Sequence, residues 1–530
     1  MPYEKEFAGS TGLKILLKDQ KLKEMLKISQ FIKTDTEFDR IDDFVIPPQK
    51  MNTEKVKRAF VIDGSKIEVP FVEGSLASLS IFNINQCVVD LKNVQEYLKT
   101  PFPHPSLFDK IKEHLNVLFF TPLKGMETEQ FNEAEFFRYV MYEHIKQMKN
   151  PVVDWLINNG YSIQEEETVF DTYVRLAQKG QHSIRGISCP CPVCRKSGRA
   201  VEYKNFYDKD TDEFRVQTEC KCAYDPKPLF ITDLLGFHAL LTNENGYEAL
   251  TTQIMLVMEK LLLINTLRIL KINGLKDLIN ESVFIVDGTL GFFSHASWLT
   301  APVVSEVADI KAETDLLLFS IEKSGQFLNN FKKVNENYNL QYSSYKNWGY
   351  AENKFDDPTL KNGMLFFLDE EYIKTYVKNF DEAGGFYGEK NYFGKKVFYK
   401  NKNGGLFVIN LAFEDENDKV LYDGRNTDER RAMVKRIEDV AMILDNFASQ
   451  EFANAISLLS MANEGAAISS SYMSKQLVNT FVSSILSDEE DEPKSKEKEV
   501  KKPKDEPLKE FGTEGFTQAF EGLDDTSFFE

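Results

Sequence analysis

Two apolar stretches that end in Asp-Gly decide the fold: FVIDGSKIEVP at residues 60–70 and VFIVDGTLGFF at residues 283–293. Both have the β-branched and aromatic composition of a strand. Each brings one carboxylate, Asp63 or Asp287, to the tip of its apolar run. Asp-Gly alone is a common hairpin turn, but LGFFSHASWL after the second copy does not resemble a returning strand. Carboxylates gathered at buried strand ends are tolerated beside a divalent cation, so the pair predicts a Mg²⁺ or Mn²⁺ site.

The sequence around these stretches alternates strand and helix patterns. Three runs from residue 58, RAFVIDG, SKIEVPFVE and SLASLSIFNINQCVVDL, predict an antiparallel meander with a turn at Asp63-Gly64. Helical patterns fill most of residues 95–180, a long helix is predicted near 248–272, and helices return after residue 427. We therefore expect an α/β (α+β) fold in which a mixed sheet is covered by helices.

Five of the six cysteines lie within residues 189–222, CPCPVCRKSGRAVEYKNFYDKDTDEFRVQTECKC. Cys191 and Cys194 form one knuckle, and Cys220 and Cys222 form a second, so that four thiolates can close a tetrahedral Zn²⁺ site. Cys189 could take the place of Cys191. Such a site has no open coordination position, so we expect the zinc to stabilise a ribbon and to take no part in catalysis.

Charge and composition narrow the class of protein. The chain has 530 residues, 42% of them hydrophobic, and a net charge of −19. About −8 of that charge falls in residues 487–530, whose Lys, Glu, Asp and Pro content predicts a disordered acidic tail. No apolar run reaches the ~20 residues that cross a bilayer, and MPYEKEFAG lacks the apolar segment of a signal peptide. We expect a cytoplasmic protein without membrane contact.

The order of these features resembles the NurA nucleases. The matching features are a strand ending in Asp-Gly-Ser, a helix bearing a glutamate, a strand ending in Asp-Gly-x-Leu, and a strand ending in lysine. The resemblance covers roughly residues 55–95 and 248–480. It implies a ribonuclease H-like fold and a Mn²⁺- or Mg²⁺-dependent DNA exonuclease and endonuclease. It also implies a homodimer that works with a HerA-like hexameric ATPase in DNA end processing, repair or phage defence.

The resemblance assigns roles to particular residues. Asp63 and Asp287 match metal-binding carboxylates of the family, and Glu259 matches the helical glutamate, with Glu68 as a local alternative. Lys323, in FSIEKSGQF, matches a basic residue that could hold the scissile phosphate.

One position departs from the family pattern. Asn463, in LLSMANEGAAIS, stands where the family carries a late histidine. An asparagine can ligate a metal through its carbonyl oxygen but cannot act as a general base. His295, eight residues after Asp287, is the histidine nearest to it in the sequence. The departure keeps open a second reading, a catalytically weakened zinc-ribbon subunit that binds DNA or serves as a scaffold.

The expected organisation follows from these matches. Residues 1–57 form a helical segment, residues 58–94 and 248–480 form the nuclease core, and residues 95–247 form an insertion whose zinc ribbon spans 186–225. The acidic-aromatic end of the tail, TEGFTQAFEGLDDTSFFE, could dock a protein. No Walker A motif, Ser-His-Asp signature or dinucleotide-binding fingerprint occurs, so ATPase, serine hydrolase and dehydrogenase functions have no support.

Overall fold

The fold is known from a computed structural model of the chain. It divides into two units, residues 1–479 and residues 480–530. The described residues all lie in the first unit: 43–45, 55–70, 77–94, 111–241 (apart from 124, 185, 209–212 and 223–225), 247–332, 363–366, 388, 390–418, 429, 432–448 and 456–468. The predicted acidic tail lies outside them, as does most of the predicted N-terminal segment.

The described strands are organised around one nine-stranded mixed sheet, in the order β1-β13-β14-β15-β12-β11-β2-β3-β4. β11 runs parallel to both of its neighbours, β2 and β12, and all other neighbouring strands are antiparallel. The strands are β1 (Asp43–Val45), β2 (Arg58–Pro70), β3 (Ser78–Asp90), β4 (Lys112–Pro122), β11 (Ser282–Asp287), β12 (Leu317–Glu322), β13 (Met364–Phe366), β14 (Gly394–Lys400) and β15 (Leu406–Ala412). The expected mixed α/β architecture is confirmed.

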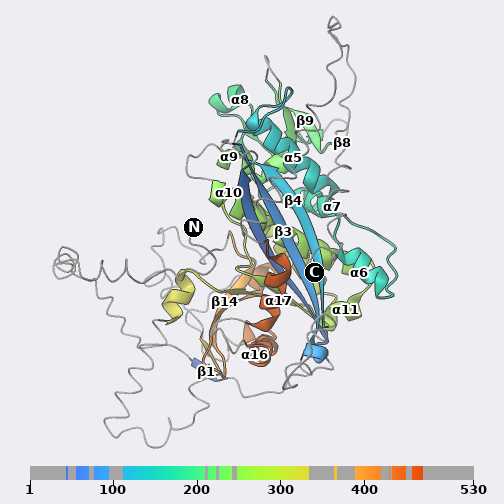
Figure 1. Ribbon diagram of the computed structural model, residues 1–530, viewed down its shortest axis with the longest axis vertical. Coiled ribbons are helices and arrows are strands. Elements are labelled where there is room, and N and C mark those ends of the chain that lie inside the picture. The colour runs from blue at the N-terminus through green and yellow to red at the C-terminus, as the bar shows by residue number, and fades with distance from the viewer. Residues whose placement is uncertain are drawn as a thin grey trace, which may run out of the picture. The chain divides into compact units, whose positions relative to one another are not determined.

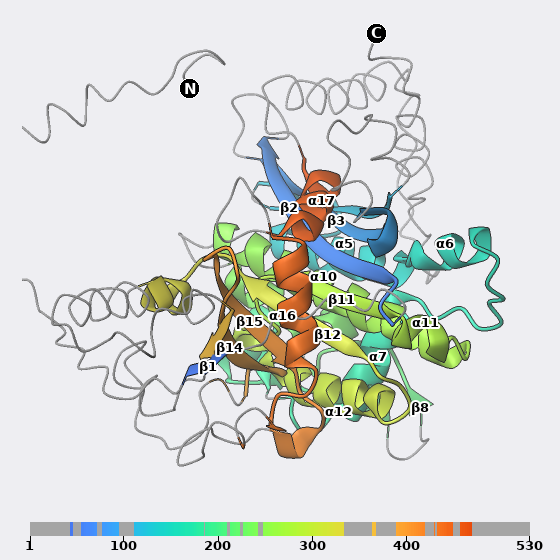
Figure 2. The ribbon, with the colours of Figure 1, turned by 90° about the horizontal axis from the view of Figure 1, so that it is seen from below.

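Helices cover both faces of this sheet, and a hydrophobic core lies on each side. The first face carries α5 (Glu133–Gln147), α6 (Val152–Asn158), α7 (Val169–Lys179), α10 (Tyr247–Ile272) and α12 (Thr300–Lys311). The second face carries α16 (Ile437–Asn446) and α17 (Ser457–Ala466), which follow one another across the strands in Figure 2. Since both faces are buried, the central strands read as nearly continuous apolar runs.

β2 differs from its prediction. The expected turn at Asp63-Gly64 is wrong, because residues 58–70 form one continuous strand. β2 pairs with β3 along its whole length, with Asp63 opposite Asn85 and Gly64 opposite Ile84. Figure 1 shows β2, β3 and β4 as long strands side by side. Thirteen paired positions outweigh the local turn preference of one dipeptide.

The meander is completed by β4, which lies within the range predicted to be a helical insertion. Helices α5 to α7 follow it. The cysteine-bearing segment after them holds three small two-stranded sheets and packs against the core of the first face. A buried ion pair, in which Arg138 of α5 donates to both carboxylate oxygens of Asp233, ties this segment to the helices.

The long helix predicted near 248–272 is confirmed as α10. It is buried over most of its circumference, including five polar or charged side chains between Glu259 and Arg268. None of the helices in the described part of the chain is long and apolar enough to span a membrane.

Candidate functional site

The two Asp-Gly sequences come together at one place in the sheet. β11 pairs with β2 in parallel up to the pair Val286–Ile62, so Asp287 follows level with Asp63. β11 ends there, whereas β2 continues to Pro70. In both cases the aspartate Oδ1 accepts a hydrogen bond from the N–H of its own following glycine, at 2.9 Å for Asp63 and 3.0 Å for Asp287.

Glu259 reaches the same place from α10. Its side chain is almost fully buried, and its Oε1 lies over the backbone of Gly64, where a Cβ would be only 2.5 Å away. Gly64 therefore makes room for a carboxylate, which explains the glycine in the middle of a strand. Glu68, the alternative, is exposed and accepts a hydrogen bond from Ser78.

The pKa values of Asp63 and Glu259 are both raised, and the neighbouring carboxylates contribute to this. Burial is the largest cause that raises the pKa of Asp63 to about 8, with Asp287 and Glu259 adding to it and Lys323 opposing it. Burial also raises the pKa of Glu259 to about 7, where Asp287 adds and Lys260 opposes. Like charges that converge in a poorly solvated place favour the protonated form unless a cation is bound.

Lys323, the predicted basic residue, contacts one of the carboxylates. It follows β12, and its Nζ is 3.0 Å from Asp287 Oδ2. About one third of the Lys323 side chain is exposed (31%), so its ammonium can reach a bound molecule as well as the carboxylate.

The sequence reasoning missed Lys260. Its side chain is fully buried, and its Nζ is 3.6 Å from Glu259 Oε2. Within the described residues, neither of these two atoms has a hydrogen-bond partner. The signal was present in the sequence: MLVMEKLLLI places one acid and one base side by side in an otherwise apolar helix.

The carboxylates are not as tightly gathered as the cysteines. Within the described part of the chain, two sets of three potential ligands have all their ligand atoms within 4.8 Å of one another, and both sets consist of cysteines. The Asp63, Glu259 and Asp287 carboxylates are more widely spaced than these sets, although Asp287 and Glu259 lie near enough to Asp63 to raise its pKa.

In the sequence, Asn463 stands where the family resemblance expects a histidine. It is exposed on α17, whose C-terminal end is held on the sheet by hydrogen bonds from Ser65 and Asn83 to the Ala466 carbonyl. Asn83 also donates to the Gly465 carbonyl at 3.0 Å.

The sequence singled out His295 as the histidine nearest to Asp287, and the structure brings His114 to the neighbourhood of β2. His295 is exposed and packs against Gly236. His114 lies on β4, two strands from Asp63, with its Nδ1 at 3.2 Å from Asn85 Oδ1.

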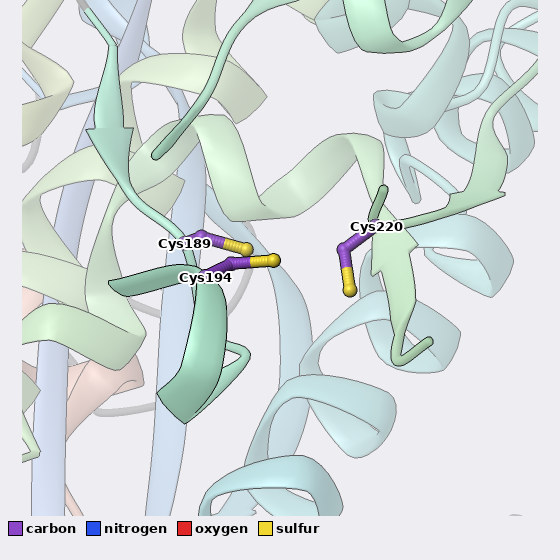
Figure 3. A group of neighbouring side chains, drawn as sticks. All are labelled: Cys189, Cys194 and Cys220. Atoms are coloured by element: carbon purple, nitrogen blue, oxygen red, sulfur yellow. The ribbon is translucent and has the colours of Figure 1, made fainter. Parts of the chain in front are cut away.

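The cysteine cluster is a separate centre (Figure 3). One set contains Cys189, Cys194 and Cys220, and the other contains Cys191, Cys194 and Cys222. All five side chains are buried. Cys189 follows β5 (Ile187–Ser188), Cys194 lies in α8 (Pro192–Lys196), and Cys220 follows β9 (Gln217–Glu219).

This cluster could hold a metal ion. The Lys227 N–H donates to Cys220 Sγ at 3.2 Å, a contact that suits a metal-bound thiolate. The structure includes Cys189 in one of the two sets, whereas the sequence offered it only as a substitute for Cys191. Cys194 is common to both sets and is central to any metal coordination here.

A further hollow lies near the acids, between the first half of α10 and the loop that follows Asp287. Its volume is ≈ 460 Å³, and it is lined by Glu248, Ala249, Thr252, Gln253, Leu256, Val257 and Gly291 to Phe293. The Gln253 side chain closes one end by donating from Nε2 to the Phe293 carbonyl at 2.9 Å.

Comparison with known proteins adds no relatives: no family model, no curated protein and no solved structure matches the chain.

Proposed function

We propose that the protein is a Mn²⁺- or Mg²⁺-dependent DNA nuclease of the NurA kind. One observation carries this proposal: Asp63, Glu259 and Asp287 come from three elements far apart in the sequence and lie close enough that Asp287 and Glu259 raise the pKa of Asp63 and Asp287 raises that of Glu259. The strand order β4-β3-β2-β11-β12 supports it, since an antiparallel meander followed by two parallel strands suits the ribonuclease H-like fold that the resemblance implies.

The residues fit a divalent cation. All three side chains offer the carboxylate oxygens that Mg²⁺ and Mn²⁺ prefer. The Glu259 Oε2 atom is buried and has no hydrogen-bond partner among the described residues, although the Lys260 Nζ lies 3.6 Å away, so a cation would satisfy this acceptor. The raised pKa values of Asp63 and Glu259 give the same indication, because a bound cation would remove the repulsion that keeps these groups protonated.

The residues of the site would have separate roles in metal binding and phosphate binding. Asp63, Asp287 and Glu259 would hold the ion, which when bound supplies Lewis-acid activation of water and stabilisation of the leaving oxygen. The partly exposed Lys323 would bind a non-bridging oxygen of the scissile phosphate while its other contact, to Asp287, keeps it oriented. Gly64 has no side chain, and this would leave the room in which the Glu259 carboxylate lies against β2.

The cysteine cluster would hold a structural Zn²⁺ in this proposal, within a zinc ribbon inserted into the nuclease core. Four thiolates leave no coordination position for substrate, so the metal would stabilise the fold around it. The remaining partners rest on the family resemblance: DNA as substrate, a HerA-like hexameric ATPase, and a second copy of the chain. The predicted docking role of the acidic-aromatic end lies outside the described residues.

A specific observation favours a second candidate, a catalytically weakened subunit that binds DNA or serves as a scaffold. Asn463 stands where the resemblance expects a histidine, and its side chain is exposed. The carboxylates and Lys323 favour the enzyme, because a scaffold has no need for two buried acids beside a half-buried one that repels them.

One assay separates the two candidates. Purified full-length protein is incubated with linear double-stranded and single-stranded DNA and Mn²⁺, with EDTA as the control, alone and with a HerA-like ATPase. Cleavage should fall by about 10²-fold or more in Asp63→Asn and Asp287→Asn. Glu68→Gln, which removes an exposed carboxylate from the same strand as Asp63, should cleave like the wild type. Equal cleavage by all variants, or none by the wild type under any condition, would overturn the enzyme proposal.

A further inference from the structure

The hollow beside the carboxylate site is built from two of the elements that carry the acids. Thr252, which lines it from α10, precedes Glu259 by seven residues. Seven residues are two helical turns, so the two side chains lie on the same side of the helix, ~10 Å apart along its axis. The opposite wall, Gly291 to Phe293, begins four residues after Asp287. The hollow therefore continues the carboxylate site along α10.

Both walls are held in place by contacts of the protein itself. Lys66 of β2 donates from Nζ to the Thr251 and Thr252 hydroxyls, each at 2.6 Å. These bonds fix the first turns of α10 on the strand and engage the ammonium. The Phe293 ring packs edge-on against Tyr392, with the ring centroids 5.6 Å apart and the planes at 83°. A site that is already formed loses little conformational freedom when it is occupied.

The lining of the hollow selects the kind of group that fits it. Its volume of ≈ 460 Å³ lies in the ~300–1,000 Å³ range of small-molecule sites. Leu256, Val257 and the half-buried Phe293 supply apolar surface beside the Gln253 amide. The described residues that line it include no lysine or arginine, and Glu248 adds a negative charge, so a phosphate is disfavoured. A flat, neutral group with a polar edge fits best, and in DNA that group is a nucleobase.

We propose that the hollow binds a nucleobase of the DNA strand, from a nucleotide next to the scissile phosphate, and that the base stacks on Phe293. This role rests on the proposed nuclease function, from which DNA is taken as the ligand. Stacking on an aromatic side chain tolerates every base, so the hollow would not select a sequence. A base held there cannot pair with a complementary strand, so the substrate at this site would be single-stranded or locally opened DNA.

The test separates base binding from all other contacts with DNA. The full-length protein carrying Asp63→Asn and Asp287→Asn, which should not cut DNA, is titrated in EDTA by fluorescence anisotropy. Two labelled single strands of equal length are compared, one with thymine at every position and one with abasic sites throughout. Phe293→Leu, added to this parent protein, should weaken binding of the thymine strand at least about fivefold and change binding of the abasic strand less than about twofold, because one stacked base is lost.

Two further variants control for the ring and for its place. Phe293→Tyr keeps an aromatic ring and should bind both strands like the parent protein. Tyr161→Leu should do the same, because it removes a half-buried ring that follows α6 and does not line the hollow. Equal weakening of both strands by Phe293→Leu, or weakening of neither, would overturn the proposal. A parent protein that binds neither strand would overturn it as well.

A second change to the hollow covers the case in which Phe293→Leu loses its native circular dichroism spectrum. Ala249 lines the hollow from an exposed position on α10, so Ala249→Leu narrows the hollow without disturbing the core. This variant should weaken binding of the thymine strand and leave that of the abasic strand unchanged. Equal binding of the thymine strand by Ala249→Leu and the parent protein would then decide against the base site.

The outcome is separable from that of the proposed function, because binding is measured without cleavage. A loss confined to the thymine strand, in a protein whose wild type does not cut DNA, would keep the base site and refute the nuclease. DNA cleavage by the wild type, together with equal loss on both strands in Phe293→Leu, would do the reverse.

Discussion

The carboxylate site and the cysteine cluster are assembled in opposite ways. The five clustered cysteines lie within residues 189–222, and short strands and one helical turn bring them together locally. The carboxylates come from β2, α10 and β11, and they meet only because the central sheet pairs strands that are distant in the sequence. The cysteine cluster should therefore depend on its metal for stability, whereas the carboxylate site should depend on the sheet for its geometry.

The largest expected effect is at Cys194, which belongs to both cysteine sets. Cys194→Ser should lower the zinc content from about one per chain to nearly none, and the segment around residues 189–222 should become sensitive to protease. Elemental analysis and limited proteolysis measure these changes. Cys87→Ala, at the sixth cysteine in the core of the second face, should keep its zinc. A Cys194→Ser protein with normal zinc would place the metal elsewhere.

The next effect concerns Gly64. In Gly64→Ala the new Cβ would lie 2.5 Å from Glu259 Oε1, which should displace the carboxylate, reduce DNA cleavage at least tenfold and destabilise the fold by about 1–3 kcal/mol. Chemical denaturation and a nuclease assay measure the two quantities. Combining the change with Glu259→Ala removes the clash, so the stability losses should be less than additive. Fully additive losses would show that Gly64 has another role.

A smaller effect concerns pH in EDTA. The pKa values of Asp63, about 8, and Glu259, about 7, lie above their ordinary values of 3.8 and 4.5. Between these limits the folded state binds more protons than the unfolded state, so the stability from these groups is lost as pH rises from about 4 to 8. An Asp63→Asn, Glu259→Gln variant should lack this slope in its melting temperature. Saturating Mn²⁺ should stabilise the wild type more at pH 8 than at pH 5.

The smallest effect is expected at Asn463. Because this side chain is exposed, Asn463→Ala should change unfolding free energy by no more than about 0.5 kcal/mol. Cleavage should stay within about twofold of the wild type, since no described contact links this residue to the site. A tenfold loss of activity would return Asn463 to the place that the family resemblance gives it.

The sequence was sufficient to predict the elements that carry strong periodic or apolar patterns. The strands before Asp63 and Asp287, the helix of Glu259 and the lysine after β12 are all present, and they lie at one site. The cysteine cluster could also be predicted from the sequence, because its members lie close together along the chain. The roles of these residues remain predictions.

What could not be predicted depends on pairing across the sheet. Asp63-Gly64 has the local preference of a turn, and only full pairing with β3 and the approach of Glu259 make it a strand interior. KEHLNVLFFTP has no clear period, and its place beside β3 makes it β4. Lys260 looks like any surface lysine until both sides of α10 are known to be buried.

The parallel pairing of β11 with β2 has a consequence for synthesis on the ribosome. When β2, β3 and β4 have emerged, the partner of the free β2 edge has not yet been translated, because β11 begins only at Ser282. An apolar strand edge then stays open, and such edges recruit other chains. We expect slow, chaperone-dependent folding, and a nascent chain in which the acids remain apart until most of the protein has been made.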